Sequence, residues 1–240
     1  MTRRDRPTPD HALWLAWRGA VSALPEGFRA EIVEGCVEVS PTSRLRHTGI
    51  ANRLRKALDS AMAGSGPHAL QYVYVIHGRR AWHPDVVVTS GDGPEQGAED
   101  GIGIRAEAVR LVVEVVSPGS DSITRDRTRK RRAYARAGIP VYVLIDDYDD
   151  GGTVTVLSRP DREKAIYGDE VRAAYGAAVT VPEGPAKGFV IGEDITGAGQ
   201  PRRGWSREKT DPASFEFERS GVVSHSRTRG GAVSGRSPGS

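Results

Sequence analysis

Two acidic residues lie in strongly apolar stretches of the chain, where a charge is most costly. Asp85 directly precedes three valines, and Glu114 interrupts the apolar run of residues 111–116. A carboxylate in a core strand is unfavourable unless it is paired or binds a metal. If the two strands are neighbours, the carboxylates converge and repel each other, which a divalent cation would relieve. The alternative is structural: Asp85 caps the strand after Pro84, and Glu114 pairs with an arginine.

A basic stretch follows the strand that contains Glu114. Asp126, Lys130 and Tyr134 recur there at four-residue steps, so in a helix they share one face. If the Lys130 ammonium reached the two carboxylates, it could stabilise the charge of a phosphoryl-transfer transition state. The alternative is an ordinary surface ion pair between Asp126 and Lys130. Arginines at positions 125, 127, 129, 131, 132 and 136 could bind phosphates, although a charged helix face is usually exposed to solvent.

Hydrophobic periodicity predicts the elements that position these residues. Alternating residues at 31–40 predict a hairpin around Glu34-Gly35. A helix is expected between residues 41–43 and 64–67, and a second from about residue 124 to 137, ended by Gly138. Strands are predicted at 70–77, 85–89, 109–116 and 141–145, with weaker signals at 153–158, 178–181 and 189–191, and a long exposed loop at 90–108.

The strand, helix and strand of residues 109–145 predict a parallel pair with a right-handed crossover. The fold class is therefore α/β, with a mixed sheet flanked by helices.

Composition limits the class of protein. The chain has 240 residues, 38% of them hydrophobic and 27% charged, which suits one core domain and excludes wholesale disorder. Its apolar runs are far shorter than the roughly 20 residues that a membrane helix needs, and an apolar signal core is lacking, so we expect a soluble, cytoplasmic protein without a membrane partner. The single cysteine, Cys36, excludes an intramolecular disulfide and a Cys-rich zinc site.

The end of the chain differs from the rest. Residues 197–240 contain eight Gly, eight Ser and three Pro, with eight basic against four acidic residues, and they lack periodicity. We predict a core domain at residues 10–196 and a disordered basic tail at 197–240. The first 196 residues hold 26 basic and 27 acidic residues, so any polyanion site in the core must come from local clustering.

Taken together, the motifs resemble the Uma-two family of restriction endonucleases, a branch of the PD-(D/E)XK nuclease superfamily. The resemblance spans about residues 12–195 and is most specific at 111–146. The matching positions are Glu34-Gly35, Ser40-Pro41, His47, Pro84-Asp85 with the following valines, residues 113–118, Asp126, Lys130, Tyr134, residues 138–140, Tyr142 and Asp146.

The resemblance implies a restriction-endonuclease-like fold and hydrolysis of DNA phosphodiester bonds that leaves a 5′ phosphate and a 3′ hydroxyl. Asp85 and Glu114 match the acidic motif residues that bind Mg²⁺ or Mn²⁺, and the carbonyl of Val115 would complete the metal shell. The chain departs from the superfamily at Val116, where the motif lysine should stand, and Lys130 matches a family lysine that suggests a migrated catalytic residue.

Further residues are assigned accessory roles. Glu34 and His47 match family positions near the site, although His47 could equally be a helix-surface histidine, and Asp126 and Tyr134 share the face of Lys130. We expect Arg125, Arg129 and Arg132 to contact DNA phosphates.

Two other functions remain open. The missing lysine at Val116 is compatible with a catalytically inactive member that binds DNA or a protein partner. A zinc-bound structural protein that uses His77, His83 and Asp85 is a further alternative. If the protein cuts both strands, symmetry favours a homodimer.

Overall fold

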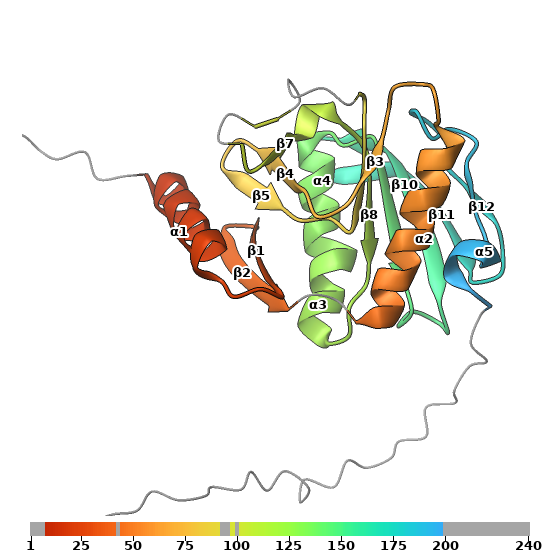
Figure 1. Ribbon diagram of the computed structural model, residues 1–240, viewed down its shortest axis with the longest axis horizontal. Coiled ribbons are helices and arrows are strands. Elements are labelled where there is room, and N and C mark those ends of the chain that lie inside the picture. The colour runs from red at the N-terminus through yellow and green to blue at the C-terminus, as the bar shows by residue number, and fades with distance from the viewer. Residues whose placement is uncertain (1–7, 42–43, 92–96, 99–100, 199–240) are drawn as a thin grey trace, which may run out of the picture. The chain divides into compact units, whose positions relative to one another are not determined.

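A six-stranded mixed sheet forms the centre of the molecule, in the strand order β11-β10-β9-β8-β6-β3 (Figure 1). β8 and β9 are parallel and the other neighbouring pairs are antiparallel. This confirms the predicted mixed sheet. The strands are β3 (Ala69–Leu70), β6 (Val86–Thr89), β8 (Val109–Val115), β9 (Val141–Asp146), β10 (Thr153–Asp161) and β11 (Ile166–Ala174).

The crossover between β8 and β9 is one long helix in three consecutive segments, because a parallel pair cannot be joined by a tight turn. The segments are α3 (Ser120–Thr124), the π-helical η3 (Arg125–Lys130) and α4 (Arg131–Ala137). Gly138 ends the helix in the left-handed conformation at φ 79°, which confirms the predicted stop. A π-helical turn inside an α-helix is rare and is often found at functional sites.

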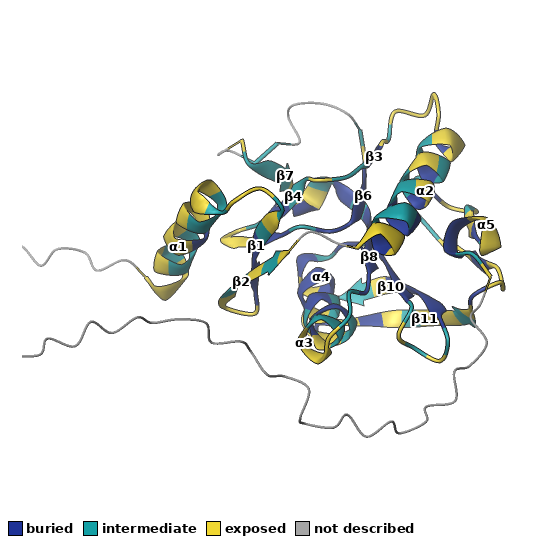
Figure 2. Ribbon diagram, turned by 60° about the horizontal axis from the view of Figure 1, so that its bottom comes forward, coloured by how far each residue is buried: buried dark blue, intermediate teal, exposed yellow. Residues whose placement is uncertain are grey.

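The central strands are buried on both faces, as the dark blue of β6 and β8 in Figure 2 shows. Side chains alternate along a strand, so Val86, Val88 and Val113 pack on the same side as α2 (Leu45–Ala61). Val87 and Val112 pack on the opposite side with α4. The crossover helix and α2 therefore cover opposite faces of the sheet.

A hairpin precedes the sheet. β1 (Phe28–Val33) pairs with β2 (Cys36–Pro41), and Val33 lies opposite Cys36, which confirms the predicted two-residue turn. Glu34 and Gly35 both have positive φ angles, 47° and 84°, as a type I′ turn requires. The hairpin packs against α1 (Pro9–Ala23), which the sequence analysis did not predict, and the buried Trp17 donates a hydrogen bond to the carbonyl of Ala30 at 2.9 Å.

Smaller elements complete the fold. A three-stranded sheet holds β5 (Arg80–Trp82), β4 (Tyr74–His77) and β7 (Gly103–Arg105), which leads into the 3-10 turn η2 (Ala106–Ala108). β12 (Val179–Thr180) pairs with β13 (Val190–Ile191), and α5 (Glu193–Thr196) follows.

Three predictions of secondary structure were wrong. The stretch 70–77 is two strands in different sheets, separated by Tyr72, whose φ of 58° interrupts an extended chain. The stretch 90–108, expected to be a loop, contains β7, which pairs with β4, and η2. β11 was not predicted, because many of its residues are exposed and polar, as is usual for a strand at the edge of a sheet.

The computed structural model describes residues 8–41, 44–91, 97–98 and 101–198, all within the compact unit Met1–Arg203. Nearly all of the predicted tail, residues 199–240, lies outside the described residues, and so do parts of the loop at 90–108. Among the helices of the described ranges, none is long and apolar enough to span a membrane.

Candidate active site

The pairing of β6 with β8 brings the two acidic residues together. Val86 lies opposite Val113, so continuing the antiparallel register by one residue sets Asp85 opposite Glu114. Opposite residues in such a pair point to the same face, with their Cβ atoms about 4.5–5.5 Å apart. Both side chains are buried, and the charge of Asp85 raises the pKa of Glu114. The predicted convergence of Asp85 and Glu114 is therefore present.

Asp85 is held by three neighbours. Its Oδ2 accepts a hydrogen bond from the backbone N–H of Val115 at 2.8 Å, and its Oδ1 lies 2.9 Å from Nε2 of His47 and 3.5 Å from a guanidinium nitrogen of Arg29. Burial alone would raise the pKa of Asp85, but the close contact and charge of His47, together with Arg29, hold it well below its ordinary value. Asp85 is thus an ionised carboxylate.

Glu114 has a different environment although it lies beside Asp85. Its Oε1 lies 2.9 Å from Nζ of Lys130 and also accepts a short hydrogen bond from the hydroxyl of Tyr134. Burial raises the pKa of Glu114 to about 8, since the attraction of Lys130 is offset by the nearby charges of Asp126, Asp85 and Glu31. Two neighbouring carboxylates with opposite pKa shifts are common at catalytic sites.

Lys130 lies between two carboxylates and is fully buried. Its Nζ is 2.8 Å from Oε1 of Glu31, 2.9 Å from Oε1 of Glu114 and 4.0 Å from Oδ1 of Asp126. Burial lowers the pKa of a lysine, but Glu114 and Glu31 raise that of Lys130 above its ordinary value, so the amine stays protonated. The surface ion pair considered as the alternative for Lys130 is therefore wrong.

Glu31 is the main site residue that the sequence analysis missed. It is fully buried on β1, accepts the backbone N–H of His83 at 2.7 Å, and keeps its second oxygen without a hydrogen-bond partner. Burial opposes its ionisation, but Lys130 and Arg29 lower the pKa of Glu31 to about 2. Glu31 occupies a polar position of the alternating stretch 31–40, so no apolar run marks it as buried.

Arg125 and Asp126 adjoin this cluster, at the start of the π-helical segment. Arg125 donates to Oδ1 of Asp126 at 3.1 Å and to the hydroxyl of Ser40 at 3.2 Å. Tyr142 donates its hydroxyl to the carbonyl of Asp126 at 2.8 Å. Asp126 and Tyr134 thus lie in the buried cluster, on the face predicted for Lys130.

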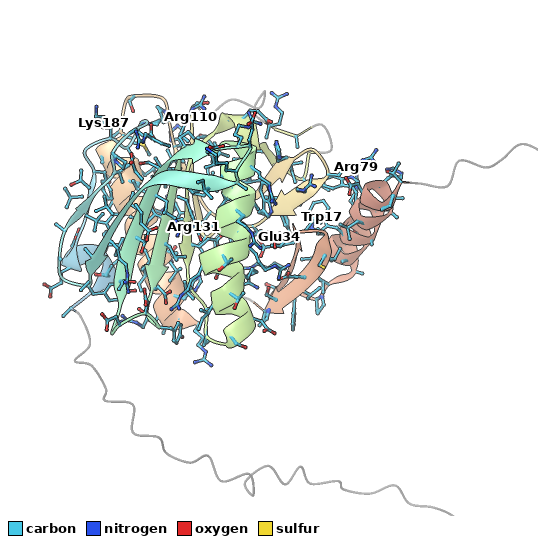
Figure 3. All side chains as sticks on the ribbon, turned by 180° about the vertical axis from the view of Figure 1, so that it is seen from behind. Trp17, Glu34, Arg79, Arg110, Arg131 and Lys187 are labelled. Atoms are coloured by element: carbon cyan, nitrogen blue, oxygen red, sulfur yellow. The ribbon has the colours of Figure 1, made fainter. Side chains whose placement is uncertain are left out.

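The structure does not bring Glu34 into the cluster. Glu34, labelled in Figure 3, lies at the exposed hairpin turn. Its carboxylate accepts two hydrogen bonds of 2.8 Å from Arg132 and lies 3.5 Å from Arg129. Arg129 also pairs with Glu38. Two of the three arginines assigned to DNA phosphates are therefore engaged by acidic residues of the hairpin. Their contact with phosphate is untested, and the paired guanidinium of Arg132 argues against it at that position.

A pocket of about 430 Å³ opens beside His47, and we call it the arginine pocket. Four arginines line it, Arg29, Arg44, Arg46 and Arg125, together with the hydroxyls of Ser40, Ser117 and Ser122. Val116, which replaces the motif lysine, also lies at its wall. Clustered guanidinium groups and hydroxyls are the donors that bind phosphate groups in proteins.

The described residues contain no group of three or more His, Cys, Asp or Glu side chains arranged to hold a metal ion. This removes support for the zinc alternative: His77 stacks on Trp82, and His83 packs edge-on against Tyr74. It is compatible with magnesium, which usually binds one or two carboxylates and keeps several water molecules.

Comparisons with known proteins agree with the fold. A family model, Uma2, described as "Putative restriction endonuclease", matches residues 17–186. A crystal structure from Anabaena variabilis, described as "a putative nuclease belonging to DUF820", is similar with a TM-score of 0.56 and 20% sequence identity, covering 80% of this chain and 98% of that chain. At this identity the likeness shows a shared fold. No curated protein sequence matches the chain.

Proposed function

The chain belongs to the Uma2 family of restriction-endonuclease-like nucleases, and from this premise we propose that it is a metal-dependent endonuclease that hydrolyses DNA phosphodiester bonds. The observation that carries the proposal is the pair of buried carboxylates, Asp85 and Glu114, on adjacent strands with the ammonium of Lys130 against one of them. The alternative, in which Asp85 caps the strand and Glu114 pairs with an arginine, does not fit Glu114, whose partners are Lys130 and Tyr134.

Asp85, Glu114 and the main-chain carbonyl of Val115 are the groups that would hold Mg²⁺ or Mn²⁺. The donor chemistry fits, since hard divalent cations prefer carboxylate and carbonyl oxygens. The raised pKa of Glu114 also fits, because a buried carboxylate among other carboxylates gains most from a cation. When bound, the metal would supply a water of lowered pKa and neutralise phosphate charge.

The side chains around the carboxylates have separate tasks in this proposal. Lys130 stays protonated, so it acts as a cation that orients the attacking water or neutralises the charge of the pentacovalent phosphate, and does not accept a proton. His47 orients Asp85 through the 2.9 Å contact. The arginine pocket binds the phosphates of the DNA strand next to the scissile bond.

Nicking of supercoiled plasmid by purified protein tests this function. Wild-type protein should nick the plasmid with Mg²⁺ or Mn²⁺ and stop when a chelator is added. The nicking rate of Asp85→Asn should be at least about hundredfold below that of wild type, while the variant stays folded. The matched control is Asp169→Asn, because Asp169 forms an exposed ion pair with Arg159 on the edge strand β11.

The outcome also separates the nuclease from the inactive member of the family. Equal nicking by wild type and Asp85→Asn would contradict the proposal and indicate a contaminating nuclease. Salt-dependent DNA binding without nicking, unchanged in Asp85→Asn, would instead support a DNA-binding protein that has lost catalysis.

A further inference from the structure

A second pocket, which we call the aromatic pocket, adjoins the candidate active site. It has a volume of about 450 Å³ and shares Arg29 and His47 with the arginine pocket. Asp85 and Pro84 form part of its wall, so any group bound there lies next to the proposed metal ligands. The volume is within the range of about 300–1,000 Å³ that is typical of small-molecule sites.

Two aromatic rings at this pocket are unusually exposed. Tyr72 is 75% exposed and Phe28 is 48% exposed, and both line the pocket. Tyr72 also has a φ of 58°, in the left-handed region that is unfavourable for a bulky residue. Backbone strain of this kind persists where the surrounding structure enforces it, often at functional sites. The flat faces of exposed rings are the surfaces on which unpaired bases stack.

Polar groups of the pocket complement the rings. Gln71 and Thr48 add an amide and a hydroxyl to the lining. These two side chains supply both donors and acceptors, and the edge of a nucleobase presents both as well.

We propose that the aromatic pocket binds one unpaired nucleobase beside the scissile phosphate, stacked on Tyr72 and Phe28. The proposal rests on the nuclease function and narrows its substrate to DNA with an unstacked nucleotide at the cleavage site. Such DNA is either single-stranded or has one base turned out of the duplex, because a base inside the stack does not expose its face. The arginine pocket then takes the phosphates of the neighbouring nucleotides.

The test uses short single-stranded oligonucleotides with one 2-aminopurine and matched duplexes, added without divalent metal so that cleavage does not occur. Wild-type protein should bind the single strand more tightly than the duplex and quench 2-aminopurine by stacking. Tyr72→Ala should weaken single-strand binding about tenfold and abolish the quenching, whereas Tyr72→Phe should stay within about twofold of wild type. Val171→Ala, an exposed position on β11 outside both pockets, serves as the control and should bind like wild type.

Plasmid nicking in Mg²⁺, measured in parallel, separates the two proposals. If wild type nicks DNA but the double variant of Phe28→Ala and Tyr72→Ala binds single strands unchanged, the base pocket is overturned and the nuclease stands. If wild type nicks nothing but Tyr72→Ala still weakens single-strand binding, the base pocket stands and the nuclease fails. Wild type that binds no oligonucleotide overturns the base pocket, and the nuclease proposal then stands or fails on the nicking result alone.

Discussion

The crossover helix of residues 120–137 forms ion pairs of similar length on two faces with different surroundings. On the inner face, Lys130 is fully buried and lies 2.8 Å from Glu31 and 2.9 Å from Glu114. On the outer face, the half-buried side chain of Arg131 lies 2.8 Å from Glu170 of β11, on the opposite side of the helix from the hairpin in Figure 3.

Because the distances hardly differ, the surroundings decide what each pair contributes. A surface pair exchanges water for a partner at little net gain, typically about 0–1 kcal/mol. A buried ammonium between carboxylates cannot be removed without leaving charge unpaired in a medium that does not solvate it. The two faces therefore predict different consequences for the same kind of substitution.

The largest effect on stability is expected from Lys130→Met. This change leaves Glu31 and Glu114 without their shared ammonium and should lower the free energy of unfolding by about 3–5 kcal/mol. Arg131→Met on the outer face should lower it by less than about 1 kcal/mol. Urea unfolding followed by circular dichroism measures both, and equal losses would contradict the comparison.

The pH dependence of stability should reveal the opposite pKa shifts of Glu31 and Glu114, the two carboxylates that contact Lys130. The pKa of Glu114 is raised to about 8, so its contribution is present below its ordinary pKa and is lost as pH rises toward 8. The pKa of Glu31 is lowered to about 2, so its contribution is present above the ordinary pKa and is lost as pH falls toward 2. The contributions are on the order of 5 kcal/mol for Glu114 and on the order of 3 kcal/mol for Glu31, since one pKa unit corresponds to about 1.4 kcal/mol.

The measurement is the free energy of unfolding of metal-free protein across this pH range. Glu114→Gln should flatten the decline on the neutral side, and Glu31→Gln should flatten the decline on the acid side. If the Glu114→Gln profile runs parallel to that of wild type between about pH 5 and about pH 8, the assignment of a protonated Glu114 is wrong.

A smaller effect is expected at His47, which contacts the proposed metal ligand Asp85 rather than the metal. His47→Ala should raise the Mg²⁺ concentration needed for half-maximal nicking by about 10- to 100-fold. Leu45→Ala, at the exposed start of the same helix, is the control. His47 is buried against Asp85, so the helix-surface alternative is wrong, and an unchanged Mg²⁺ requirement would mean that this contact stabilises the fold without affecting the metal.

The smallest effect is expected at Arg132. Its two hydrogen bonds to Glu34 are exposed to solvent, so Arg132→Ala should leave the free energy of unfolding close to that of wild type. Arg132→Ala should also leave the salt dependence of DNA binding unchanged, because the guanidinium of Arg132 is already hydrogen-bonded to Glu34. A decrease of about one in the slope of log affinity against log salt would show that Arg132 contacts a phosphate after all.

Much of the sheet could be predicted because its central strands are continuously apolar. The valines beside Asp85 and the run around Glu114 are buried on both faces, and such runs indicate interior strands without any knowledge of their partners. β11 and β7 lie at sheet edges, where polar residues on exposed positions hide the pattern of a strand. The register that sets Asp85 opposite Glu114 could only be assumed.

The site was predicted in part for a similar reason. Asp85 and Glu114 were conspicuous because they interrupt apolar strands, and the spacing of Asp126, Lys130 and Tyr134 gave the helix face. Glu31 was missed because it occupies a polar position of an alternating stretch, where the pattern does not mark a charged residue as buried. The engagement of Arg129 and Arg132 by Glu38 and Glu34 depends on how the hairpin packs on the helix, which local sequence does not encode.

The central claim is that Lys130, from the crossover helix, takes the proposed catalytic role of the motif lysine, whose position is occupied by Val116. The rate of Mg²⁺-dependent plasmid nicking by Lys130→Met, corrected for its folded fraction and compared with that of Arg131→Met, tests this claim most directly. We predict a rate at least about hundredfold below wild type for Lys130→Met and a rate near wild type for Arg131→Met. Folded Lys130→Met that nicks plasmid as fast as wild type would contradict it.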